Sequence, residues 1–158
     1  MEAENTENLQ NVQTIKIGEA EVTIAKVDPV FTDERGSITD LLNEHLNHVG
    51  LITTEAGAVR GNHYHKLSRQ YSYIPSGKFE VLLAPADKPE EVTKVVLKEK
   101  ELITIPPMVI HTFKAIETAD MIDMISESRG QDGYEQDTVR IKIEDPDTHP
   151  SSDENAQE

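Results

Sequence analysis

The chain has 158 residues, no cysteine and a formal net charge of -15. The length suits one domain with a buried core, and the lack of cysteine excludes disulfides, thiolate metal ligands and thiol nucleophiles. The excess of acids argues against binding to nucleic acid or to an anionic membrane, and no run approaches the roughly 18 apolar residues of a membrane span.

The two ends of the chain differ in composition from the part between them. All 15 Lys and Arg lie within residues 16 to 142, so both ends carry acids alone. We expect disordered acidic tails at residues 1–11 and 144–158, on either side of one folded domain at 12–143. The first residues lack the basic start and apolar stretch of a secretory signal, so a cytoplasmic protein is expected.

Short strands separated by turns account for most of the domain. Apolar alternation predicts strands on both sides of Gly18 within 12–27, and then at 38–42, 49–54, 58–65, 70–74, 78–84, 92–97, 102–105, 111–116, 121–126 and 138–143. We expect the strand at 70–74 to form a hairpin with 78–84, and 92–97 to pair with 102–105. No long amphipathic helix is predicted. Roughly ten short strands with this spacing predict an antiparallel jelly-roll sandwich or barrel.

Three histidines are the candidate functional residues. His63 and His65 are two residues apart in a predicted strand, so both side chains project to the same side. His111 follows a Pro-Pro turn 46 residues after His65. With the amide oxygen of Gln70, three neutral imidazoles predict a site for a divalent metal such as Zn, Fe, Ni, Mn or Cu. An amide in place of a carboxylate removes a charge and is expected to weaken metal binding.

The spacing of these residues resembles the two cupin motifs. The first motif is reproduced by Gly57, His63, His65, Gln70 and Gly77, with Gln70 where many metal cupins have glutamate. The second is similar to 106–111, where Met108 stands in place of the usual glycine. The resemblance implies an all-β cupin fold, the double-stranded β-helix or jelly-roll barrel, with its site inside the mouth.

The flanking residues are similar to three groups of enzymes that act on nucleotide-linked sugars. The stretches 30–36 and 60–64 resemble dTDP-4-dehydrorhamnose 3,5-epimerases, 63–70 and 137–140 resemble sugar-nucleotide 3,4-ketoisomerases, and 33–37 with 61–65 resembles the cupin half of capsular-polysaccharide assembly enzymes. The resemblance implies an epimerase or isomerase acting on a nucleotide-linked 4-keto-deoxysugar in surface-polysaccharide biosynthesis. It also implies a homodimer formed through outer strands.

The resemblance implies roles for particular residues in taking a proton from the carbon beside a ketone. His63 matches the catalytic histidine of the epimerases and is the expected base. His65, His111 and Gln70 either hold a metal that polarises the ketone or orient the sugar without one. A His63 that ligates metal cannot also be a free base, so both roles stay open.

Other candidates lie further from the histidine motif. Tyr134 is a catalytic candidate if its loop folds over the site, because the strand at 121–128 lacks the tyrosine that serves the epimerases as proton donor. Arg35 and Arg60 are expected to bind the diphosphate, since the planar arginine fork meets phosphate oxygens at two points. Tyr71 and Tyr73 are expected on the outer face of the barrel. Met108, Met121 and Met124 are expected in the core.

Two alternatives to the sugar-nucleotide enzyme remain. A metal-dependent cupin dioxygenase uses a three-histidine site with open positions to activate oxygen. A non-catalytic cupin binds a sugar or another small molecule without turning it over. Oxygen uptake favours the first alternative, and ligand-dependent stabilisation without proton exchange favours the second.

Overall fold

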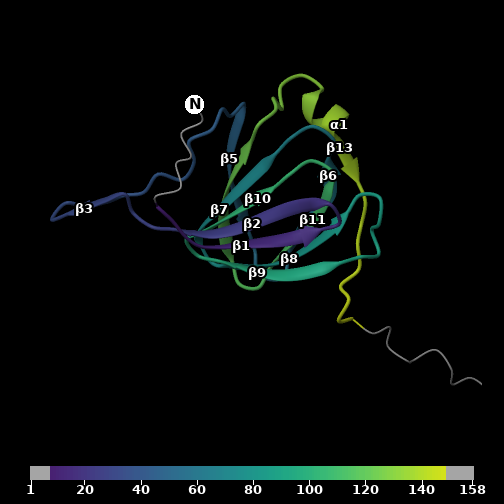
Figure 1. Ribbon diagram of the computed structural model, residues 1–158, viewed down its shortest axis with the longest axis horizontal. Helices are drawn as coiled ribbons and strands as arrows, with labels where there is room; N and C mark the ends of the chain where they lie inside the picture. Colours follow the sequence, from purple (N-terminus) through teal and green to yellow (C-terminus); the bar gives the residue numbers. More distant parts are fainter. Residues whose placement is uncertain (1–7, 149–158) are drawn as a thin grey trace, which may run out of the picture.

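Figure 1 shows the computed structural model, which describes residues 8–148 as two facing antiparallel sheets. The larger sheet contains, in spatial order, β1 (Leu9–Ile17), β2 (Ala20–Val27), β10 (Glu101–Ile105), β7 (Gln70–Ser76), β12 (Ala119–Ile125) and β5 (His48–Thr54). The smaller sheet contains β13 (Thr138–Arg140), β6 (Val59–His65), β11 (Val109–Ala115), β8 (Lys78–Pro85) and β9 (Thr93–Lys98). A projecting hairpin of β3 (Phe31–Asp33) and β4 (Gly36–Ile38) and one short helix, α1 (Gly133–Asp137), complete the elements. The predicted all-β jelly roll is confirmed.

Apolar side chains from the two sheets fill the space between them. Phe79, Val81 and Leu83 of β8 are fully buried on one face, as their alternation predicts, and they belong to the same core cluster as Ile103 and Ile105 of β10. Burial of each large apolar side chain contributes about 1.5–3 kcal/mol. This core holds the two sheets together.

Strands that follow one another in the chain mostly lie in different sheets. β7 pairs with β10 and β12, whereas β8 pairs with β9 and β11. The predicted pairing of 70–74 with 78–84 is therefore wrong, and so is that of 92–97 with 102–105. Each of these turns carries the chain from one sheet to the other. Gly77, between β7 and β8, has a φ of 85°, and a Cβ there would lie 2.4 Å from the Cβ of Ala119.

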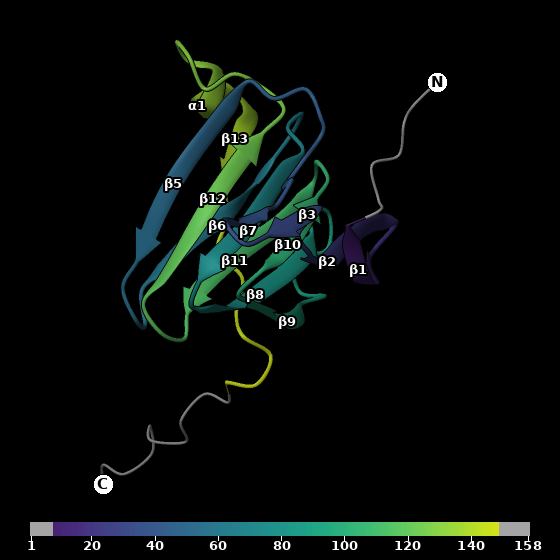
Figure 2. The same ribbon diagram turned by 90° about the vertical axis from the view of Figure 1, so that its left-hand side faces the viewer.

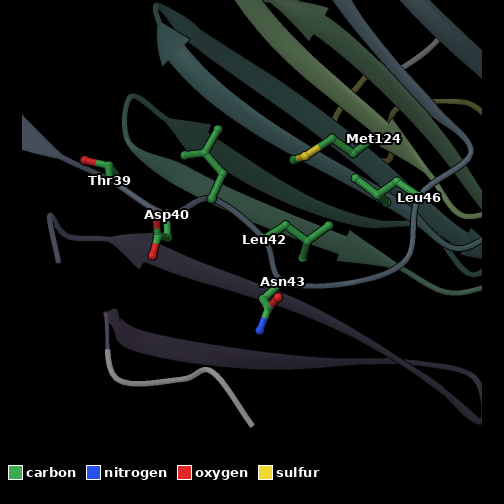
Figure 3. Close-up of a pocket in the computed structure, with 7 residues that line it drawn as sticks. Thr39, Asp40, Leu42, Asn43, Leu46 and Met124 are labelled. Atoms are coloured by element: carbon green, nitrogen blue, oxygen red, sulfur yellow. The ribbon is translucent and has the colours of Figure 1, made fainter. Parts of the chain in front are cut away.

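A loop covers the outer face of the larger sheet. Leu42 and Leu46 pack with Met124 of β12, and Figure 3 shows these three side chains at a groove. The groove has a volume of about 490 Å³. Tyr71 and Tyr73 belong to the same outer cluster, which confirms their predicted placement. The groove lies on the opposite face of this sheet from the barrel interior, because Met124 alternates with inward-facing neighbours.

The ends of the domain extend slightly further than predicted. β1 begins at Leu9, three residues before the predicted start of the domain. The strand predicted at 38–42 is wrong, because β4 covers Gly36–Ile38 and residues 39–42 form no strand. At the other end, Asp145 lies in the predicted tail but forms an ion pair with Lys94 of β9, with Nζ 3.0 Å from Oδ1. The remaining residues of the predicted tails, 1–7 and 149–158, lie outside the described residues. Within residues 8–148, no helix has the length and apolar character needed to cross a membrane.

Candidate functional site

Neighbouring strands of the smaller sheet bring the three predicted histidines together. His63 of β6 lies directly opposite His111 of β11, and their ring centroids are 4.7 Å apart. The ring of His65 lies 4.9 Å from that of His63 and 5.6 Å from that of His111. The predicted convergence of these residues inside the barrel is therefore present in the fold.

A β-bulge sets the positions of the rings. His63 pairs with His111 but Gly61 pairs with Thr112, so Asn62 is the extra residue on β6. Asn62 has a left-handed φ of 56°, and its Oδ1 accepts a 2.9 Å hydrogen bond from the Thr112 hydroxyl. A Cβ at Gly61 would lie 2.5 Å from the carbonyl oxygen of His111, so the close approach of the two strands requires glycine there.

The hydrogen bonds of two rings leave one nitrogen of each unused. The Nδ1 of His111 lies 3.0 Å from the carbonyl oxygen of Val109, which can only accept, so Nδ1 carries the proton. The Nδ1 of His65 lies 3.3 Å from Oδ2 of Asp137. The Nε2 atoms of His65 and His111 are buried and have no partner among residues 8–148. Each of these nitrogens therefore offers a lone pair to the space between His63, His65 and His111, which we call the histidine pocket.

Burial keeps these imidazoles neutral. Desolvation, with a smaller effect from the neighbouring His65, lowers the pKa of His63 to about 4. Desolvation also lowers the pKa of His65, although the carboxylate of Asp137 opposes that shift, and it places the pKa of His111 well below its ordinary value. At neutral pH the pocket presents unprotonated nitrogens, which suit a base or a metal ligand.

Asp137 is a buried carboxylate beside His65. It accepts hydrogen bonds from the Ser68 hydroxyl and the Leu67 N–H. Burial alone would raise the pKa of Asp137, but these bonds hold it below the usual value. Asp137 is therefore ionised and orients the ring of His65.

A second polar network lines the opposite wall. The buried Gln70 donates from Nε2 to the Ser72 hydroxyl at 3.1 Å, and that hydroxyl donates to Oδ1 of Asp123 at 2.9 Å. Burial raises the pKa of Asp123, and Oδ2 of Asp123 lies 3.6 Å from Nη2 of Arg129. Neither Asp123 nor Arg129 was among the predicted site residues. Alternation along β12 was a usable signal for Asp123, but the loop around Arg129 has no period.

Tyr134 lies close to the histidines because α1 closes over the barrel mouth. Its ring centroid is 6.4 Å from that of His63 and 6.2 Å from that of His65. The guanidinium of Arg129 lies over the same ring, 4.4 Å from its centroid. The loop thus folds over the site, which is the condition on which Tyr134 was a candidate.

The structure does not bring the two predicted diphosphate ligands to the histidines. Arg35 lies between β3 and β4 on the projecting hairpin, which Figure 1 shows. Its exposed side chain is paired with Asp33. Arg60 donates to the Thr53 carbonyl at 2.9 Å and lies three residues before His63. Met108 is also outside its predicted place: it is 48% exposed with a φ of 66°, the left-handed conformation for which the cupin motif has glycine.

A family model described as "Polysaccharide biosynthesis C-terminal domain" matches residues 31–139 of the chain. The matched region contains all three histidines and Tyr134, Asp123 and Asp137. The comparison with curated proteins gave no match.

Solved structures share the fold. A dTDP-4-dehydrorhamnose 3,5-epimerase from Sulfolobus tokodaii has a TM-score of 0.66 and 20% identity over 85% of this chain and 86% of that one. A sugar 3,4-ketoisomerase from Thermoanaerobacterium thermosaccharolyticum in complex with TDP has a TM-score of 0.61 and 22% identity over 75% and 87%. An epimerase from Legionella pneumophila in complex with dTDP-4-keto-L-rhamnose has a TM-score of 0.62 and 16% identity over 82% and 77%. These likenesses confirm the predicted cupin fold.

Proposed function

This chain belongs to the polysaccharide biosynthesis C-terminal domain family, and we propose that it is an epimerase or isomerase acting on a nucleotide-linked 4-keto-deoxysugar. The observation that carries the proposal is the pairing of His65 with the buried carboxylate of Asp137, which leaves Nε2 of His65 free inside the pocket. Relatives of the same fold were solved with TDP or with dTDP-4-keto-L-rhamnose, which supports a substrate of this class.

The chemistry begins with removal of a proton from the carbon beside the ketone. We assign the base to His65, because Asp137 stabilises the imidazolium that forms when Nε2 takes the proton. His63 is the base that its match to the epimerase motif predicts. Its pKa of about 4, however, makes it a weaker proton acceptor than His65 in this proposal. In this proposal His63 positions the sugar beside His65.

A second group must return or accept a proton at the sugar. The Tyr134 ring lies about equally far from His63 and His65, at 6.4 and 6.2 Å between centroids. We assign this role to the Tyr134 hydroxyl, which a sugar bound between the tyrosine and the histidines would contact. The assignment gives the short helix α1 a part in the reaction.

A divalent metal also fits this pocket. His63, His65 and His111 each offer a nitrogen within 4.8 Å of the others, and the Nε2 atoms of His65 and His111 are buried without a partner among the described residues. These three residues, with Gln70, would hold the ion. A bound metal would polarise the ketone oxygen as a Lewis acid. A His65 that ligates the metal would no longer be the free base.

The test is incubation with dTDP- and UDP-4-keto-6-deoxyhexoses in heavy water, with and without a chelator. Deuterium entering beside the ketone is the expected result, and its absence with both nucleotides would overturn the proposal. Loss of exchange on chelation, restored by one added metal, assigns the pocket to a cation. Oxygen uptake in place of exchange would favour the dioxygenase.

We also propose that the chain forms a homodimer through the larger sheet. β5 is an edge strand (Figure 2), and its Val49 and Leu51 are 59% and 71% exposed. The projecting hairpin exposes Phe31 and Ile38 in the same way. Exposed apolar residues on an unpaired edge favour pairing with another chain.

A further inference from the structure

Arg129 has no role in the function proposed so far, yet it lies at the mouth of the histidine pocket. It follows β12 in the loop that leads into α1, and its side chain is 32% exposed. Its guanidinium covers the Tyr134 ring at 4.4 Å, and that ring is 6.2 Å from His65. The arginine therefore lies next to the tyrosine that neighbours the histidines.

The hydrogen-bond donors of Arg129 are incompletely used. Its Nε is buried and has no partner among residues 8–148. Its Nη2 is 3.6 Å from Oδ2 of Asp123, which is an ion-pair distance and too long for a hydrogen bond. Buried donors without a partner are rare and costly in native proteins, so an unused N–H beside a pocket calls for an acceptor.

The contacts of Arg129 fix the position of its guanidinium but do not fully neutralise its positive charge. Asp123 approaches one edge of the guanidinium and Tyr134 covers one face. The positive charge of Arg129 also acts on the histidines. It lowers the pKa of His63, and only burial and the neighbouring His65 lower that pKa more. Arg35, by contrast, is paired with Asp33 on the projecting hairpin.

We propose that Arg129 binds the oxyanion of the reaction intermediate, a role that rests on the proposed function. When His65 takes the proton, the C–H bond breaks, its electron pair forms a carbon–carbon double bond and the ketone oxygen becomes negative. The Nε–H of Arg129 donates to that oxygen. Reprotonation of the carbon reverses the flow of electrons, so the step needs no further reactant. A positive donor fixed where charge develops stabilises the transition state more than the ground state.

The kinetic test compares Arg129→Gln and Arg129→Lys in the heavy-water assay. Arg129→Gln is expected to lower kcat for exchange by about 100-fold with little change in KM, as removal of one oxyanion donor does. Arg129→Lys keeps the charge without the planar fork and should recover part of the rate. Lys142→Gln removes a positive charge from an exposed side chain and should leave the rate unchanged. An unchanged kcat in Arg129→Gln, in an assay where the wild type exchanges, overturns the inference and leaves the proposed function standing.

A binding test separates the two ideas without turnover. Acetate, a planar carboxylate, is titrated into chelator-treated protein while the Tyr134 and His65 ring signals are followed by NMR. Saturable shifts whose affinity falls at least about tenfold in Arg129→Gln, but not in Lys142→Gln, support the anion site. Equal affinity in wild type and Arg129→Gln overturns it. Arg129-dependent acetate binding in a wild type that catalyses no exchange refutes the proposed function and supports the anion site alone.

Discussion

Asp137 is the residue that distinguishes His65 from His63. Asp137→Asn keeps the size of the side chain but removes the charge that stabilises a protonated His65. We expect Asp137→Asn and His65→Asn each to lower proton exchange by at least about 100-fold, the usual contribution of a positioned base. The heavy-water assay measures this loss.

His63→Asn is the matched control for that prediction. It removes a neighbouring imidazole that has no carboxylate partner among residues 8–148, and we expect a smaller loss of exchange than in His65→Asn. A loss in His63→Asn larger than in His65→Asn would return the role of base to His63. Far-UV circular dichroism of each variant checks that the barrel still folds.

The pocket histidines should make the metal-free protein sensitive to acid. The pKa of His63 is about 4 in the fold and 6.5 as its ordinary value, so between these pH values the unfolded chain binds more protons than the native one. The free energy of unfolding therefore keeps the full contribution of His63 above pH 6.5, and it falls as the pH drops towards 4. Thermal unfolding at a series of pH values should show this fall, and His63→Asn should reduce its slope. An equal slope in the variant would contradict the assignment.

The site residues that belong to a motif with fixed spacing could be predicted from the sequence. His63, His65, His111 and Gln70 have a spacing that predicts a shared site. The three histidines come together in the fold, and the buried Gln70 belongs to the polar network on the opposite wall. Asp123 and Arg129 carry no such spacing, because they reach the pocket through a strand and a loop that come later in the chain. Arg35 has the right chemistry for phosphate, but its position depends on a hairpin whose direction no local pattern fixes.

At the scale of elements, the bulge at Asn62 determines whether His63 faces His111. Asn62→Ala leaves the left-handed conformation without the local hydrogen bonds of an asparagine, which costs about 1–2 kcal/mol. It also removes the hydrogen bond from the Thr112 hydroxyl, which contributes about 1 kcal/mol. Asn62→Gly removes only the bond and should destabilise the fold less. Urea unfolding measures both free energies.

Thr112→Val is the control for the bulge. It removes the same hydrogen bond from the partner side and leaves the backbone of Asn62 unchanged. If Asn62→Ala costs no more than Thr112→Val, the left-handed conformation is not the source of the loss. The conformational cost is supported if Asn62→Ala exceeds both Asn62→Gly and Thr112→Val.

The strands themselves were predictable, but their neighbours were not. Alternation in β8 correctly places Phe79, Val81 and Leu83 on one face, because burial of every second residue is a local property. β8 pairs with the next strand, β9, and with β11, which the chain reaches only after it has crossed to the other sheet and back. A turn at 75–77 has similar residues whether it closes a hairpin or changes sheet, so the sequence predicted the wrong partner.

At the scale of the whole molecule, the proposed dimer predicts where a surface charge is harmful. Leu51→Lys on β5 and Ile38→Lys on the hairpin should shift the protein from dimer to monomer, because each places a charge in the apolar contact. Val96→Lys, on the edge strand β9 of the other sheet, should leave the dimer intact. Light scattering after size-exclusion chromatography measures the mass. A monomeric wild type, or dissociation by Val96→Lys alone, would contradict the predicted surface.

The alternation of consecutive strands between the two sheets also has a consequence for synthesis of the protein. β6 lies between β11 and β13, so the walls around His63 are supplied by segments that the ribosome makes much later. Segments far apart in the chain must lose conformational entropy to meet before their contacts stabilise the fold, so such a topology folds slowly. A nascent chain released before β13 should therefore be open to proteases and unable to retain a ligand, which makes completion of the last strand the moment at which the protein becomes competent.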